Sequence, residues 1–117
     1  MLSLCVAEGW PSLPQDPERA ARAFTAPGVT TVVALDERDV AGFAQLFSDG
    51  EIQAFLALVV VDARFRGRGI GRALVTEALR MSGGERVDLL SEDDAAGFYQ
   101  AFPQFRKSGF RLYRSVW

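Results

Sequence analysis

The chain of 117 residues contains no histidine and a single cysteine, Cys5. Without histidine the protein lacks the usual general base, the commonest metal ligand and any Ser–His or Cys–His dyad. A lone cysteine excludes an intramolecular disulfide bond and a cysteine metal site. We therefore expect no metal centre, and proton transfer has to use a carboxylate, a tyrosine, a backbone group or water.

Long apolar runs and a basic amino-terminal leader are also missing. The longest apolar run, Ala54–Val61, is closed by Asp62 and is much shorter than a membrane-spanning helix. The first ten residues carry no basic segment of the kind that opens a signal peptide. A net charge of −2 argues against a general binder of nucleic acid. These absences favour a cytoplasmic protein without membrane or nucleic-acid partners.

The length is that of one domain, so residues 1–117 are expected to fold as a unit. Apolar periodicity, turn residues and capping residues predict the order of its elements. That order is a short helix ending near Ala7, a helix at Glu18–Phe24 capped by Asp16, strands at Val29–Leu35, Val40–Phe47 and Glu51–Val61, a helix at Ile70–Met81, a strand at Arg86–Leu90, a helix from Ala95 to Phe102 and a last strand at Gly109–Trp117. It predicts an α/β structure of the three-layer α+β type, with a mixed, mainly antiparallel central sheet flanked by helices. The third strand, apolar on both faces at its end, is expected to be the most buried.

The junction between the third strand and the next helix carries the most informative segment. Glycines alternate there with arginines, at Gly67, Gly69 and Gly71 and at Arg64, Arg66, Arg68 and Arg72. A glycine-rich turn before a helix directs several backbone N–H groups to one point, at the positive end of the helix dipole. Neighbouring guanidinium groups add charge and bidentate donors. Residues 66–72, called the glycine–arginine turn below, therefore predict a site for a phosphate-rich ligand.

Two common phosphate-binding motifs do not fit this turn. A P-loop needs lysine and then serine or threonine after its last glycine, whereas Gly71 is followed by Arg72 and Ala73. A dinucleotide fingerprint needs glycine or alanine three residues after its second glycine, and from Gly69 that position is Arg72. Three strands in a row ahead of the turn also disagree with a βαβ unit.

A third pattern, Arg/Gln-x-x-Gly-x-Gly/Ala, does fit, because the turn reads Arg66-Gly-Arg-Gly69-Ile-Gly71 between a long strand and a helix. This turn resembles the acetyl-CoA signature of the GCN5-related N-acetyltransferase (GNAT) family. Ala95-Ala-Gly-Phe-Tyr99 resembles the family's later Ala-x-x-Phe-Tyr stretch, and Gly109-Phe110 resembles the opening of its terminal strand. The likeness runs from Val29 onward. It implies an acyl-CoA N-acyltransferase-like fold that here lacks the family's first strand.

The resemblance also implies a donor and a set of site residues. Acetyl-CoA would be the co-substrate, with its pantetheine paired to the exposed backbone of a bulged strand at Val59, Val60 and Val61. Its pyrophosphate would lie on the turn, which assigns cofactor binding to Arg66, Gly67, Arg68, Gly69, Ile70, Gly71 and Arg72. An amine would attack the thioester directly, and the hydroxyl of Tyr99 would protonate the leaving thiolate.

The sequence offers three carboxylates as general base. Glu51 opens the third strand, Asp62 closes it, and Glu92 precedes the last helix. Each is equally explained as a turn or cap residue, and a water chain to bulk solvent is an alternative. Many family members have a cofactor-contacting Asn near the position of Glu92, and an ionised glutamate cannot donate that hydrogen bond.

Three functions stay open from the sequence. The first is an N-acetyltransferase acting on a small-molecule or peptide amine. The second is a non-catalytic acyl-CoA-binding or regulatory module, and the third is a partner subunit whose missing strand comes from another chain. A missing edge strand leaves backbone donors and acceptors exposed, which favours a homodimer. The segment Phe102–Ser108 is expected to line the acceptor pocket or a dimer contact.

Overall fold

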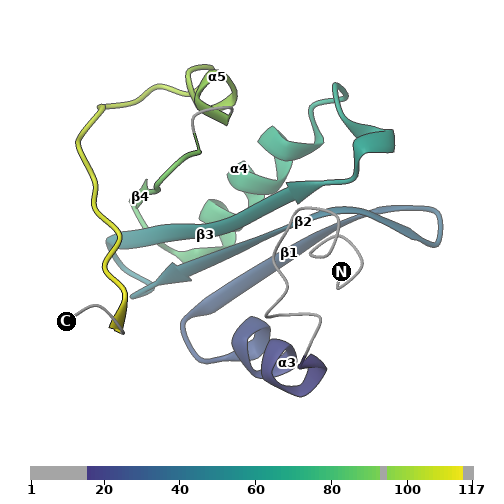
Figure 1. Cartoon of the computed structure of the whole chain (residues 1–117), viewed down its shortest axis with the longest axis horizontal. Coiled ribbons are helices and arrows are strands. Elements are labelled where there is room, and N and C mark those ends of the chain that lie inside the picture. The colour runs from purple at the N-terminus through teal and green to yellow at the C-terminus, as the bar shows by residue number, and fades with distance from the viewer. Residues whose placement is uncertain (1–15, 93–94, 115–117) are drawn as a thin grey trace.

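The computed structural model describes residues 16–92 and 95–114, whose elements keep the predicted order from the helix capped by Asp16 to the last helix (Figure 1). The helices are α3 (Pro17–Thr25), α4 (Ile70–Ser82) and α5 (Ala96–Tyr99), the strands are β1 (Val29–Asp36), β2 (Asp39–Ser48), β3 (Gln53–Val61) and β4 (Arg86–Asp88), and η1 (Ala63–Phe65) is a single 3-10 turn. The helix expected near Ala7 lies outside the described residues. Every helix within the described ranges is too short or too polar to span a bilayer.

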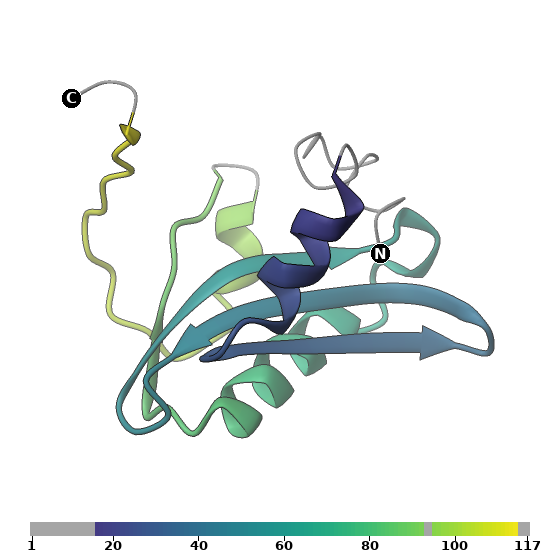
Figure 2. The same ribbon diagram turned by 90° about the horizontal axis from the view of Figure 1, so that it is seen from below.

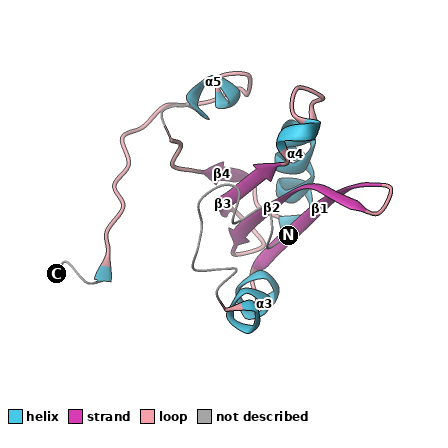
Figure 3. Ribbon diagram, turned by 45° about the vertical axis from the view of Figure 1, so that its right-hand side comes forward, coloured by secondary structure: helices cyan, strands magenta, loops and turns pink. Residues whose placement is uncertain are grey.

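The four strands form one sheet in the order β1-β2-β3-β4. β2 pairs antiparallel with both β1 and β3, whereas β4 pairs parallel with β3. The two longer helices lie on opposite faces of this sheet, α3 on one and α4 on the other (Figures 2 and 3). The sheet is therefore mixed and mainly antiparallel with helices on both sides, which confirms the predicted fold class.

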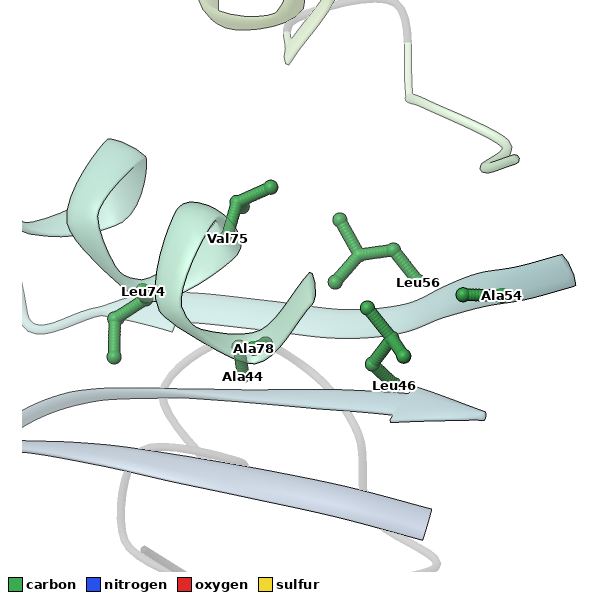
Figure 4. Close-up of a cluster of buried hydrophobic side chains, with 7 residues drawn as sticks. All are labelled: Ala44, Leu46, Ala54, Leu56, Leu74, Val75 and Ala78. Atoms are coloured by element: carbon green, nitrogen blue, oxygen red, sulfur yellow. The ribbon is translucent and has the colours of Figure 1, made fainter. Parts of the chain in front are cut away.

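One core fills the space between α4 and the sheet (Figure 4). Leu74, Val75 and Ala78 share a helix face because they are spaced one, three and four positions apart. They pack on alternate residues of the two central strands, Ala44, Leu46, Ala54 and Leu56. This packing fixes α4 over β2 and β3, and it thereby fixes the turn that precedes α4.

A second core lies under α3. Ala20 and Phe24 pack on Phe43 and Val60, and the rings of Phe24 and Phe43 meet edge to face at 5.5 Å between centroids. The buried amide of Gln45 donates to the carbonyl of Ala23 at 3.1 Å, so its burial leaves no polar group unsatisfied. The predicted cap is confirmed, because the carboxylate of Asp16 accepts from the N–H of Arg19 at 3.0 Å.

Strand β3 is bulged and parts from β4. In its pairing with β2, Gln45 is opposite Leu58 and Leu46 is opposite Leu56, so Ala57 is an extra residue. On its other edge β3 pairs with β4 only at Gln53, Ala54 and Phe55. From residue 56 to residue 61 no strand among the described residues pairs with this edge.

The extents of three predicted elements are wrong. The third strand begins at Gln53 rather than Glu51, because the carboxylate of Asp49 accepts from the N–H groups of both Glu51 and Ile52 at 2.8 Å and holds a turn. Residues 109–114 form no strand, since no described residue pairs with them. The last helix ends at Tyr99 and not near Phe102, whose N–H donates to the Tyr99 carbonyl in a tighter turn before Pro103.

The most buried strand is β2, not the third strand. Residues 41–46 of β2 are buried without interruption, whereas only three residues of β3 are buried. β2 is paired on both edges and covered by a helix on each face, but β3 is open along the edge from which β4 has parted.

We predict that Leu46→Ala lowers the free energy of unfolding by about 2–5 kcal/mol, because it empties a fully buried site in the α4 core. Urea denaturation followed by circular dichroism measures this loss. Leu35→Ala is the matched control on β1, where the leucine is mostly exposed, and it should change stability by less than about 0.5 kcal/mol. Equal losses for the two variants would contradict the assigned core.

Candidate active site

A pocket of about 740 Å³ opens where β3 and β4 part. Its walls are the second half of β3, the glycine–arginine turn, the segment after β4, and α5. Of the residues predicted from sequence, it brings together Val59, Val60, Val61, Arg66, Gly67, Gly69, Ile70, Gly71, Arg72, Glu92 and Tyr99. Arg68 and Glu51 are not among the lining residues.

The backbone of the turn explains two of its glycines. Gly67 and Gly69 have φ of 79° and 80°, in the left-handed region, and a Cβ on either would meet no atom within 4 Å. Glycine is therefore required there by conformation and not by space. Gly69 is the N-cap of α4, and no side chain caps this helix. The N–H groups of Ile70, Gly71 and Arg72 have no acceptor within the helix, and these three residues line the same pocket.

Gly71 has a different role, because it is required by space. A Cβ at this position would lie 3.0 Å from Cε1 of Phe98 and 3.5 Å from Cγ2 of Val61. The missing side chain lets the Phe98 ring pack against the start of α4. Tyr99 and Phe102 extend this contact, with ring centroids 4.8 and 5.5 Å from that of Phe98. Aromatic rings of α5 and of the turn after it thus form a wall of the pocket.

The arginines of the segment divide into two groups. Arg66 and Arg72 line the pocket; the Nε of Arg66 donates to the carbonyl of Val61 at 3.1 Å, and the guanidinium of Arg72 lies 5.4 Å from the Phe102 ring centroid. The guanidinium groups of Arg64 and Arg68 instead lie over the ring of Phe65, at 5.2 and 5.4 Å. The sequence predicts phosphate contact for two of Arg66, Arg68 and Arg72 without saying which two, and in the structure Arg66 and Arg72 line the pocket whereas Arg68 does not.

Asp62 is already engaged as a structural carboxylate. It caps η1 by accepting from the N–H of Arg64, and it forms an ion pair with the Arg64 guanidinium at 3.0 Å. The hydrogen bond from the Arg64 side chain holds the pKa of Asp62 below its usual value. A carboxylate that is stabilised in its charged form is a weaker proton acceptor, and Asp62 does not line the pocket.

Tyr99 and Glu92 are the titratable acids that the pocket contains among the described residues. Tyr99 is half-buried, and its burial raises the pKa of the hydroxyl above the ordinary value, which keeps the group protonated at neutral pH. Glu92 is exposed at the rim. Glu51 lies in the β2–β3 turn, at the end of β3 remote from the glycine–arginine turn, and is therefore separated from the pocket.

Sequence reasoning missed Arg111, which also lines the pocket. It lies almost forty residues beyond the turn, in the segment for which the sequence predicts only a terminal strand. The sequence gives one indication of this role: Arg111 is a basic residue between the apolar residues Phe110 and Leu112. No group of three or more acidic or cysteine side chains within residues 16–92 and 95–114 is placed to hold a metal ion.

The family model for the acetyltransferase (GNAT) domain matches residues 27–102, which is more than half of the chain. This range contains the sheet, the glycine–arginine turn, α4 and α5. No curated protein matches the chain significantly by sequence. The chain belongs to the GNAT acetyltransferases.

Solved structures agree with this assignment. A protein from Deinococcus radiodurans R1 assigned as an acetyltransferase is 32% identical, with a TM-score of 0.75 over 92% of this chain and 75% of that one. A second, from Agrobacterium tumefaciens C58, is 26% identical with a TM-score of 0.75 over 97% and 90%. An aminoglycoside acetyltransferase from an uncultured soil sample shares the fold, at 22% identity and a TM-score of 0.72 over 86% and 74%.

We predict that Gly67→Ala destabilises the protein by about 1–2 kcal/mol, because alanine is strained at a φ of 79°. Thermal unfolding measures the effect. Gly97→Ala is the control: this glycine also lines the pocket with no atom within 4 Å of an added Cβ, but its φ is not in the left-handed region. Because alanine is the better helix former, Gly97→Ala should leave stability unchanged or raised. A loss at Gly97 as large as at Gly67 would refute the conformational argument.

Proposed function

We propose that this protein transfers the acetyl group of acetyl-CoA to an amine. The observation that carries the proposal is the pocket that joins an unpaired strand edge to an uncapped helix N-terminus across a glycine turn. Coenzyme A combines the two matching chemistries, because it has a pyrophosphate at one end of a pantetheine arm that carries amide groups. A metal or a second cofactor is not needed for this transfer.

The pyrophosphate fits the start of α4. N–H groups of residues 70–72 supply donors at the positive end of the helix dipole, and the glycines allow a phosphate to approach the backbone. Arg66 and Arg72 supply charge beside them. The amides of pantetheine fit the edge of β3 at residues 59–61, where backbone groups have no partner from β4. This division of roles supports the assignment of both ends of the donor.

The proposed reaction needs only two side chains for proton transfer. Acetyl-CoA supplies a thioester, whose carbonyl carbon bonds to the amine nitrogen as its bond to sulfur breaks. Backbone N–H groups of β3 next to the bulge at Ala57 are candidates to stabilise charge on the carbonyl oxygen. Tyr99, protonated at neutral pH, donates the proton that the thiolate needs. Glu92, through water, takes the proton that the amine gives up.

The acceptor is proposed to be a small-molecule amine. This proposal is supported by one protein of similar fold, which is an aminoglycoside acetyltransferase. A peptide amine is the alternative that a screen of amines would separate, read by release of free thiol from acetyl-CoA.

We predict that Arg72→Ala weakens coenzyme A binding about tenfold, because one charge-assisted hydrogen bond to phosphate is lost. Isothermal titration calorimetry measures the dissociation constant. Arg80→Ala is the matched control on the same helix, since Arg80 pairs with Glu77 and does not line the pocket. Affinity should be unchanged in that variant. Absence of binding to the unaltered protein at millimolar coenzyme A would sink the proposal.

We predict that Tyr99→Phe lowers kcat about 100-fold, with little change in the KM for acetyl-CoA, because a general acid acts in the transition state. Thiol release in the presence of the preferred amine gives both constants. Tyr113→Phe is the control, since Tyr113 is exposed and does not line the pocket. An unchanged kcat would remove Tyr99 from the mechanism. Tight binding without transfer to any amine would favour the non-catalytic module instead.

A further inference from the structure

Among the described residues that line the pocket, Arg111 is the one basic residue from outside the glycine–arginine turn. It lies in the last described part of the chain, residues 103–114, which runs from the end of α5 past β4 (Figures 1 and 3). The ion pairs between described residues lie elsewhere, and none of them includes Arg111. The reaction proposed above gives this guanidinium group no role, although it presents five N–H donors to the pocket.

Arg111 enters the pocket at the end opposite to the turn. β4 pairs with β3 up to Asp88, so Leu90 follows near the level of the bulge residue Ala57. Gly109 lies against Leu90, since a Cβ on this glycine would be 2.3 Å from Cδ2 of the leucine. Figures 1 and 2 show the segment that carries Arg111 near the start of β3, whereas the turn lies beyond the end of this strand.

This placement separates Arg111 from the phosphate end of the donor. From Ala57 to Val61 an extended strand rises roughly 13 Å, at about 3.3 Å per residue. In the proposed complex the pantetheine arm runs along this length, with the pyrophosphate at the turn and the thioester near the bulge. Arg66 and Arg72 therefore lie at the pyrophosphate end, and Arg111 lies at the thioester end, where the acceptor has to bind.

The thioester end of the pocket carries one negative and one positive side chain. Glu92 follows Leu90 by two residues, and Arg111 follows Gly109 by two residues. Because two residues of extended chain span at most roughly 7 Å, both charged residues start close to the contact between Leu90 and Gly109. A carboxylate and a guanidinium group that do not pair with each other match a molecule that has both an amino and an acidic group. A polycationic amine would instead bring positive charge beside Arg111.

We propose that the acceptor is a small amine that also carries a carboxylate or a phosphate group, and that Arg111 binds this group. The paired N–H donors of a guanidinium group match two oxygens of either anion. The inference rests on the acetyl transfer proposed above, since it names the acceptor of that reaction. It makes Arg111 a specificity-determining residue, in contrast to Arg66 and Arg72, which are proposed to hold the donor.

A panel of amines tests the acceptor class. Thiol release from acetyl-CoA is measured with amino acids, ω-amino acids of increasing length, phosphoethanolamine, simple alkylamines, polyamines and aminoglycosides. The amine with the highest kcat/KM should carry an acidic group, and the panel shows whether this group is a carboxylate or a phosphate. A best acceptor without an acidic group overturns this inference and leaves the acetyltransferase proposal intact. No transfer to any amine overturns both.

Substitution of Arg111 tests the contact itself. Arg111→Gln should lower kcat/KM for the best acceptor about 10- to 100-fold, because a charge-assisted hydrogen bond is lost. For the uncharged counterpart of that acceptor, its amide or its dephosphorylated alcohol, the change should be less than about threefold. Because both substrates are assayed with both proteins, their difference in basicity cancels. Arg114→Gln is the matched control, since Arg114 is exposed on the same segment and does not line the pocket.

The control variant should behave as the unaltered protein with both substrates. An equal loss for the acidic acceptor and its uncharged counterpart in Arg111→Gln would give Arg111 a structural role and overturn the inference.

Calorimetry with coenzyme A then separates donor from acceptor. Arg111→Gln should leave the dissociation constant of coenzyme A within about twofold, whereas Arg72→Ala should weaken binding about tenfold. A loss at Arg111 as large as at Arg72 would place the Arg111 guanidinium on the donor, which contradicts its assignment to the acceptor.

Discussion

The parting of β3 from β4 is the constraint on which the rest of the molecule depends. Two strands that pair for only three residues leave backbone donors and acceptors along the second half of β3 without a partner from β4. Buried backbone groups need partners, so this edge has to be used by water, by a ligand or by another segment. The bulge at Ala57 lies where the separation begins, and the α4 core holds β3 in place while β4 departs. The pocket thus arises from an interruption of the sheet.

The same interruption explains the demand for glycine after β3. The chain has to leave a strand, turn sharply and begin a helix whose first N–H groups remain accessible. Gly67 and Gly69 supply the left-handed backbone, and Gly71 makes room for Phe98, so the three glycines answer two separate requirements. One glycine alone could not meet both the requirement for a left-handed backbone and the requirement for space beside Phe98. The aromatic rings of Phe98, Tyr99 and Phe102 then form one wall of the pocket.

The sequence predicts structure correctly where interactions between neighbouring residues determine it, and incorrectly where pairing between distant segments determines it. The α3 cap at Asp16 and the glycine turn between strand and helix depend on short-range chemistry, and both predictions are confirmed. Glu51 was assigned to a strand because its neighbours alternate, but the Asp49 carboxylate holds a turn there. The strand expected at residues 109–114 requires an edge to pair with, and alternation cannot say which edge is available. Arg111 reaches the pocket for the same nonlocal reason.

The charge around the pocket bears on the missing histidine. Of the described residues that line it, Arg66, Arg72 and Arg111 are basic and Glu92 is the one carboxylate. In the proposed complex Arg66 and Arg72 face the pyrophosphate, whose negative charge offsets theirs, and the pantetheine arm separates them from the thioester. If acetyl transfer is the reaction, the acceptor amine therefore has to give up its proton elsewhere. Because the chain has no histidine, Glu92 acting through water, or bulk solvent, takes that proton.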